Sequence, residues 1–357
     1  MLMRLRLEPR LESAKPLEVA LRVAAGALLA LVVGGFVIAL SGHDPLTSYA
    51  ALIRGGFGSR AAFEGTLNKA VPIGLCALGI AIAARARLVN IGAEGQLFFG
   101  AFAATAVGLA LPETTPSVIA LPCVIGAGIL AGAFWAALAA IPKVVFGVNE
   151  ILSTLMLNYI CLLWVGYLVR GPWADPLAYS FPYSPPILDN AQMGPLFGSL
   201  NGGLLILAAA ALCVWIIDYG TRWGYELRVS GDAPQAARYG GISATAVTLS
   251  ALGVSGALAG LAGAVELSTT TGRLQLGLSP GYGFMAILVA WLGGGRALPI
   301  IVVSILYAGL LNGGFSLQVS RIPSSISTIL QALILIMVLA GVTLGRYRIR
   351  LVRGATA

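Results

Sequence analysis

Residues 117–141 read SVIALPCVIGAGILAGAFWAALAAI and contain no charged side chain. Because about 20 mostly apolar residues suffice for a helix to cross the hydrocarbon core of a bilayer, this stretch predicts a membrane span. The rest of the chain has the same character: 58% of its 357 residues are hydrophobic and 10% are charged, against roughly 25% charged in soluble domains. With a mean hydropathy of +0.90, the composition argues against a soluble enzyme, a disordered chain or a disulfide scaffold.

Ten segments have the length and apolar character of a span. They lie at residues 19–41, 66–85, 91–111, 117–141, 150–169, 202–218, 242–266, 283–295, 298–316 and 323–344. The eighth is short and rich in glycine, so the region 281–295 is either a full span or a re-entrant segment. The sequence therefore predicts an all-α, polytopic membrane bundle of about ten helices over residues 19–344.

The basic residues predict how this bundle is oriented. Ten crossings place both termini on one side, and 16 of the 22 lysines and arginines fall there. Since cytoplasmic loops carry the excess of basic residues, segments 1–18 and 345–357 are expected in the cytoplasm. The loop 219–241 is then cytoplasmic and the loop 170–201 lies outside. The net charge of +8 thus indicates membrane topology rather than nucleic-acid binding.

Glycines are spread through the spans rather than gathered in linkers. Two groups recur at helical spacing: Gly126, Gly128 and Gly132 in one span, and Gly253, Gly256, Gly260 and Gly263 in another. In lipid, helices associate through close backbone approach at small residues. The groups are compatible with helices that slide and with plain packing, and the sequence leaves both open.

The chain lacks the residues of familiar catalytic sites. Its one histidine, His43, lies at the end of the first span, and no Ser/His/Asp set can be built without it. No GxxxxGK[ST] loop is present, so any ATP hydrolysis must occur on another polypeptide. The four cysteines lie in apolar segments without CxxC pairing, which favours small hydrophobes over metal ligands. We expect no catalytic residue, metal or cofactor.

Polar side chains at membrane depth are the candidates for a solute path, because placing them there costs free energy. The candidates are Asn90, Glu94, Gln96, Asn149, Ser153, Asn158 and Asn312. Gln96 and Asn158 fit best, since an amide both donates and accepts hydrogen bonds, as a ribose or purine edge requires. Helix caps and interhelical hydrogen bonds remain the alternative, and Asn149 has the form of an N-cap. Glu266, at the end of a span, is expected to be interfacial.

The cytoplasmic loop 219–241 contains a short predicted helix with a start and a stop signal, GDAPQAARYGG at 231–241. Asp232 can cap it, Pro234 suits its first turn and Gly240 can take the left-handed stop. A helix of about two turns is marginal alone in water, so it needs packing against its own membrane helices or a cytoplasmic partner. The residues expected at such a contact are Asp232, Pro234, Ala236, Ala237, Arg238 and Tyr239.

Two motifs resemble a known family. VNIGAEGQ at 89–96, running into GAFAA at 100–104, and GVNEILSTLMLNY at 147–159, followed by GPW at 171–173, are similar to permease subunits of bacterial ABC importers for branched-chain amino acids, simple sugars and nucleosides. The segment 231–242 resembles the family's coupling helix, which docks on the ATP-binding subunit. The resemblance covers about residues 20 to 345.

The resemblance implies a permease, not an enzyme, in a bacterial cytoplasmic (inner) membrane. It implies an ABC ATP-binding subunit, a second permease subunit that is a different homologous chain, and an extracytoplasmic solute-binding protein. The second motif and the GPW loop look most like the nucleoside and simple-sugar branch. The expected solute is therefore a nucleoside, with a simple sugar as the alternative.

Two other functions stay open from the residues alone. An ion-coupled secondary transporter would use intramembrane carboxylates, for which Glu94, Glu150 and Glu266 are available. A scaffold protein would transport nothing. The energy source of uptake, ATP or an ion gradient, separates these functions.

Overall fold

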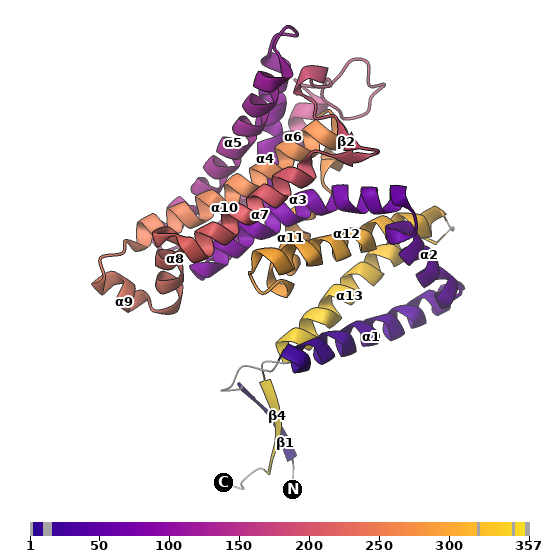
Figure 1. Ribbon diagram of the computed structural model, residues 1–357, viewed down its shortest axis with the longest axis vertical. Helices are drawn as coiled ribbons and strands as arrows, with labels where there is room; N and C mark the ends of the chain where they lie inside the picture. The colour runs from indigo at the N-terminus through magenta and orange to yellow at the C-terminus, as the bar shows by residue number, and fades with distance from the viewer. Residues whose placement is uncertain (1–2, 10–15, 320–321, 345–346, 354–357) are drawn as a thin grey trace. The chain divides into compact units, whose positions relative to one another are not determined.

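The computed structural model describes residues 3–9, 16–319, 322–344 and 347–353. Helices dominate this part of the chain (Figure 1). The chain forms two compact units: unit 1 joins Met1–Ala62 to Gly309–Ala357, and unit 2 is Phe63–Ala308.

The long helices follow the apolar segments of the sequence. They are α1 (Pro16–Leu40), α3 (Arg60–Arg85), α4 (Ala93–Ala110), α5 (Ser117–Phe146), α6 (Glu150–Arg170), α7 (Gly203–Gly220), α10 (Ala244–Glu266), α12 (Ala297–Val319) and α13 (Ser324–Leu344). Shorter helices are α2 (Pro45–Phe57), α8 (Arg222–Asp232), α9 (Pro234–Tyr239) and α11 (Tyr282–Leu292). A π-helical turn, Leu267–Thr271, continues α10.

The predicted helical membrane bundle is confirmed, with fewer clear spans than the ten counted from sequence. Among the described residues, eight helices are long and apolar enough to cross, and the α1–α2 pair, bent by 115°, would make a ninth. Helix α11 has 11 residues, about 16 Å at about 1.5 Å per residue. That is half the roughly 30 Å hydrocarbon core, so 281–295 does not hold a full-length span.

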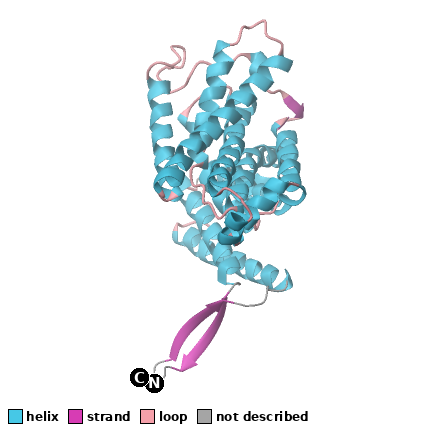
Figure 2. Cartoon of the chain, turned by 90° about the vertical axis from the view of Figure 1, so that its left-hand side faces the viewer, coloured by secondary structure: helices cyan, strands magenta, loops and turns pink. Residues whose placement is uncertain are grey.

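The two ends of the chain pair with each other in unit 1. Strand β1 (Met3–Pro9) runs antiparallel to β4 (Tyr347–Arg353), with Met3 opposite Arg353 (Figure 2). The sequence analysis treated these segments only as tails and missed the strands.

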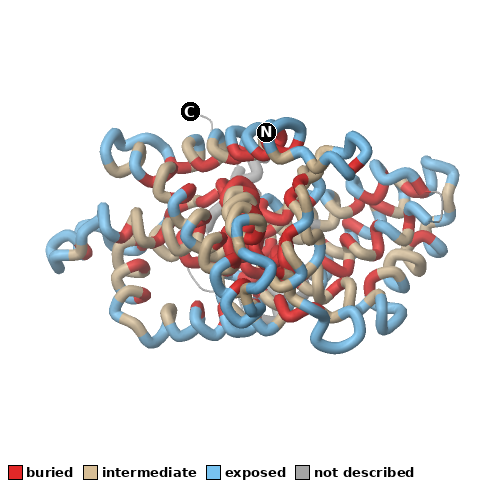
Figure 3. The backbone as a smooth tube through the Cα atoms, turned by 90° about the horizontal axis from the view of Figure 1, so that it is seen from above, coloured by how far each residue is buried: buried red, intermediate tan, exposed pale blue. Residues whose placement is uncertain are grey.

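The core of unit 2 is built on α10, which packs against α4 and α5. Gly256 and Gly260 of α10 face Gly132 of α5, where an added Cβ would come closer than 3.0 Å to backbone atoms of the opposite helix. The backbones thus touch, as the glycine spacing predicts. Gly126 and Gly253, by contrast, face open space. In Figure 3 the connecting loops are mostly exposed, while buried, intermediate and exposed residues alternate along the helices.

We expect Gly260→Leu to destabilise unit 2 by about 3 kcal/mol or more, because overpacking a close contact costs typically 1–3 kcal/mol and sometimes exceeds it. Gly253→Leu is the matched control, since it adds the same side chain to the same helix where nothing lies within 4 Å. Thermal unfolding of the purified protein in detergent would measure both. Equal unfolding temperatures for the two variants would contradict the packing described here.

Candidate functional site

One face of α6 carries three buried polar side chains, Glu150, Thr154 and Asn158. Their spacing of four residues places them in a row. This row faces the non-helical segment 86–92, which links α3 to α4. The backbone groups of this segment that are buried away from water need hydrogen-bond partners within the protein.

The α6 row supplies those partners. The Asn158 amide accepts from the backbone N–H of Gly95 and donates to the carbonyl of Ile91, both at 2.8 Å. The Thr154 hydroxyl accepts from the backbone N–H of Ile91 at 3.3 Å. The two sequence motifs are therefore the two halves of one contact.

The start of α6 is organised by Asn149 and Glu150. Asn149 is the predicted N-cap, and its Oδ1 accepts from the backbone N–H of Ile151 at 3.0 Å. The Glu150 carboxylate accepts from Lys143 Nζ at 2.6 Å and from the Val89 N–H at 3.3 Å. A carboxylate in the first turn is also favoured by the helix dipole.

Asn90 and Gln96 form a second, fully buried group. Asn90 Nδ2 donates to Gln96 Oε1 at 2.8 Å and to Ser255 Oγ on α10 at 2.9 Å. Asn90 Oδ1 in turn accepts from Gln96 Nε2 at 3.1 Å and from the Gly92 N–H at 2.9 Å. Asn90 therefore finds its hydrogen-bond partners inside the chain.

Glu94 lies where two helices begin. It belongs to the first turn of α4, is 2% exposed, and accepts from the Gly283 N–H at 2.6 Å in the first turn of α11. The positive ends of two helix dipoles thus converge on one carboxylate. Gly283 packs so tightly on the Glu94 backbone that a Cβ would not fit.

The structure therefore brings together four of the seven path candidates: Asn90, Glu94, Gln96 and Asn158. Their polar groups bond the protein itself, which favours the interhelical alternative for this conformation. Asn149 and Ser153 lie at the more exposed start of α6. Asn312 belongs to unit 1, where it donates to the carbonyls of Gly55 and Ala62. A role in the path stays a prediction.

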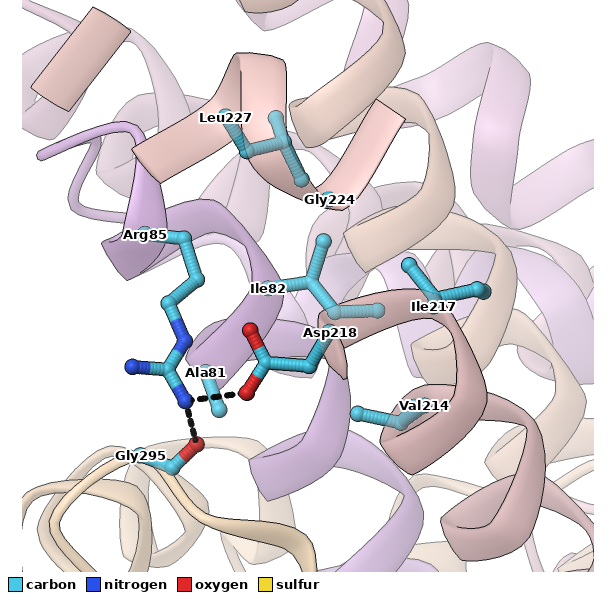
Figure 4. Close-up of a pocket in the computed structure, with 9 residues that line it drawn as sticks. All are labelled: Ala81, Ile82, Arg85, Val214, Ile217, Asp218, Gly224, Leu227 and Gly295. Atoms are coloured by element: carbon cyan, nitrogen blue, oxygen red, sulfur yellow. Dashed lines mark hydrogen bonds and ion pairs between the residues drawn. The ribbon is translucent and has the colours of Figure 1, made fainter. Parts of the chain in front are cut away.

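A charged clamp ties the segment 219–241 to the ends of α3 and α7. Asp218, at the end of α7, accepts from Arg85 of α3 at 2.5 Å and from Arg228 of α8 at 3.0 Å. Arg85 also donates to the carbonyl of Gly295, after α11, at 3.0 Å (Figure 4). The Asp218 side chain is only 12% exposed. Four elements therefore meet at one carboxylate.

The short helix expected in this segment is present as α9, with corrections at both ends. Asp232 does not cap it: this residue ends α8 and lies 3.6 Å from exposed Arg87. The left-handed residue is Gly241, at φ +76, and not Gly240, at φ −76. Helix α8 was not predicted, because it is polar and falls between the apolar runs.

The α9 residues differ sharply in exposure. Ala237 is buried in the chain itself at 4%, whereas Tyr239 is 93% exposed. Pro234, Ala236 and Arg238 are exposed as well. Of the residues expected at a partner contact, only Ala237 is buried within the chain; the others are exposed.

A polar cavity of about 350 Å³ lies in unit 2, at the end of α3 opposite Arg85. Its walls come from α3, the loop 193–201, the end of α10 with its π-turn, and the start of α11. The lining side chains that can interact with a polar ligand include Lys69, Asn201, Glu266, Thr270 and Tyr282. This volume lies at the lower end of the range of about 300–1,000 Å³ found for ligand sites.

The sequence analysis missed this cavity. None of the seven path candidates lines it, and Glu266, expected to be interfacial, is 4% exposed. The available signal was Glu266 followed by the Thr-rich stretch LSTTT at 267–271. Such a π-helical turn within a helix often marks a functional site.

The family described as "Branched-chain amino acid transport system / permease component" matches residues 62–339. The chain belongs to this permease family. It is 34% identical to a glucose ABC transporter permease protein of Haloferax volcanii, over 90% of this chain and 87% of the relative. It is 32% identical to a guanosine ABC transporter permease protein of Bacillus subtilis (92% and 93%) and 30% identical to a nucleoside ABC transporter permease protein of Lactococcus lactis (86% and 88%). No solved structure matches it.

The match covers both sequence motifs, the clamp and the cavity, so all three features lie in the permease core. The chain is thus a multi-pass membrane protein of the ABC importer permease type. These relatives are named for glucose, guanosine and nucleosides, so their names do not agree on one solute.

We expect Asn158→Leu to lower the stability of this permease by about 2–4 kcal/mol, because it leaves two buried backbone groups unpaired at about 1–3 kcal/mol each. Ser153→Ala, one turn earlier on α6, should change stability by less than about 0.5 kcal/mol, since its hydroxyl makes only a 3.5 Å contact. Thermal unfolding in detergent measures both. A stable Asn158→Leu protein that no longer supports uptake would instead assign Asn158 to the solute path.

We expect Asp218→Asn to uncouple transport, because it removes the charge that holds Arg85 and Arg228 to the ends of the membrane helices. ATP-driven uptake by the assembled transporter should fall at least about tenfold, matching the loss of one charged contact of about 1.5 kcal/mol or more. Glu226→Gln is the control, because it breaks only a surface pair with Arg222 on the same helix. Uptake by Asp218→Asn equal to that of the control would rule out the clamp as a coupling element.

Proposed function

We propose that the chain is the membrane permease of an ATP-driven importer that moves a nucleoside. The single observation that carries this proposal is the match over most of the chain to permease proteins named for guanosine and nucleosides. A simple sugar is the second candidate, supported by the relative named for glucose. The permease itself hydrolyses no ATP; a separate ABC ATP-binding subunit does so.

The ATP-binding subunit docks on α9. This helix presents Tyr239, Arg238 and Ala236 outward while Ala237 anchors it to the chain. A large aromatic side chain that is almost fully exposed, next to an arginine, is typical of an interface residue. Asp232 and Pro234 shape the entry to this surface.

The other partners are a second permease subunit and an extracytoplasmic solute-binding protein. Bacillus subtilis and Lactococcus lactis each have two permease proteins similar to this chain. This supports a pair of different homologous chains. The pairing of β1 with β4 supports both ends on one side of the membrane, and the basic residues favour the cytoplasmic side of the inner membrane. The loop 170–201 then faces the solute-binding protein.

The clamp gives a physical route for coupling. Closure of the ATP-binding subunits moves α9 and α8, and Asp218 passes that motion to α3, α7 and the turn after α11 through ion pairs and the Gly295 carbonyl. Helix α11 carries it to its other end, where Tyr282 lines the cavity. A switch of access needs contacts that differ between two states. The ion pairs of Asp218 and the contacts of α11 are the ones that we expect to differ between the two states.

The test is the ATPase activity of the purified complex with its ATP-binding, solute-binding and second permease subunits. We expect stimulation by a nucleoside, measured in a titration across nucleosides, pentoses, hexoses and branched-chain amino acids. Stimulation by a hexose alone would select the sugar alternative. Protonophore-sensitive uptake that needs no ATP would instead support an ion-coupled transporter.

The matched variant for this test is Ala236→Trp, on the exposed face of α9. It should abolish solute-stimulated ATPase activity while the permease still inserts and binds lipid normally. Ala237→Trp is unsuitable, because Ala237 is buried and the variant would disturb packing.

A further inference from the structure

We propose that the cavity of unit 2 binds the vicinal diol of a neutral sugar ring, free or as the ribose of a nucleoside, with Glu266 and Asn201 as the acceptors. The inference rests on the proposed import function and adds the recognising groups. The cavity, the buried carboxylate and an unpaired amide oxygen carry it.

Asn201 is the first observation. Its side chain is 6% exposed, it lines the cavity, and its Oδ1 has no hydrogen-bond partner. A buried acceptor left without a donor costs about 1–3 kcal/mol. Two hydroxyls of the adjoining π-turn, Ser268 and Thr271, are also buried without partners. Ser268 and Thr271 do not line the cavity, so the unpaired acceptor that a hydroxylated solute can satisfy there is the Asn201 Oδ1.

Glu266 is the second observation. The carboxylate is 4% exposed, lies at the wall, and interacts with the Thr270 hydroxyl and the charge of Lys69. The two oxygens of the carboxyl group can accept hydrogen bonds. Two adjacent hydroxyls of a sugar ring are the matching donors.

The lining further narrows the class of solute. Its ionisable acid and base are one glutamate and one lysine, so the cavity carries little net charge and suits a neutral solute better than a phosphate. Amide and hydroxyl side chains lie among Met193, Pro195 and Tyr282, and the lining residues include no leucine, isoleucine or valine. This mixture suits a sugar ring, which has polar edges and apolar faces. Tyr282, 4% exposed, offers an aromatic ring beside the acceptors.

One wall of the cavity, which is partly open, comes from the hairpin of β2 (Pro195–Phe197) and β3 (Leu200–Asn201). Asn68 of α3 holds this hairpin by donating to the Ser199 carbonyl at 2.7 Å and accepting from the Asn201 N–H at 3.0 Å. Glu64 accepts from the Ser199 hydroxyl at 2.6 Å. These polar contacts therefore connect the β2–β3 hairpin to α3.

The test compares, on the complete complex, solutes that differ by one ring hydroxyl: its removal breaks the 2′,3′-diol of uridine and the 2,3-diol of glucose. Binding without ATP is measured with tritiated uridine and 2′-deoxyuridine, and with glucose and 2-deoxyglucose, on complexes in lipid nanodiscs. We expect the wild-type complex to bind the complete diol of one pair about tenfold more tightly than its deoxy partner, as the loss of one hydrogen bond of about 1.5 kcal/mol provides. The pair that shows the difference distinguishes the nucleoside from the sugar.

Glu266→Gln and the milder Asn201→Ser should abolish or reduce that preference. Thr105→Val is the matched control, because Thr105 is equally buried but bonds its own helix α4 away from the cavity. A preference retained in Glu266→Gln, or equal loss for both members of a pair, would overturn the proposal, as would tightest binding of leucine. Diol-dependent binding without ATP-driven uptake would keep the cavity assignment and overturn the import function instead.

Discussion

A backbone group that is buried away from water must find its hydrogen-bond partner within the protein. The non-helical segment 86–92 meets this requirement through the α6 row of Glu150, Thr154 and Asn158, which bonds the backbone of Val89 and Ile91. Because this segment bends away from α3, α4 can begin within unit 2 and meet the first turn of α11 at Glu94. The position of α11, and with it one wall of the cavity, thus depends on that contact.

The apolar runs were enough to predict most of the helices, since each run must be buried in lipid or in protein. The N-cap at Asn149 and the close approach at Gly260 were also predictable, because both are local rules of chemistry and spacing. The end of α9 was not: Gly240 and Gly241 are equivalent by type, and only the folded chain shows which one takes a positive φ.

The cavity escaped prediction for a different reason. Glu266 and Lys69 are almost 200 residues apart in sequence, and only tertiary packing places them at one wall. The path candidates were chosen as polar residues at membrane depth, and that criterion does not separate residues that bond the protein from residues that face a solute. Asn90 and Asn201 are both buried asparagines, yet the first has partners for its oxygen and the second does not.

The pairing of β1 with β4 has a consequence for the covalent order of the chain. Neighbouring strands of a sheet lie about 4.7–4.9 Å apart, so the segments next to the two termini are neighbours in space. A short peptide could join them without crossing the membrane, and the exposed turn near residues 112–116 could then become the new pair of ends. The pairing of β1 with β4 is therefore compatible with a circularly permuted chain that begins in that turn.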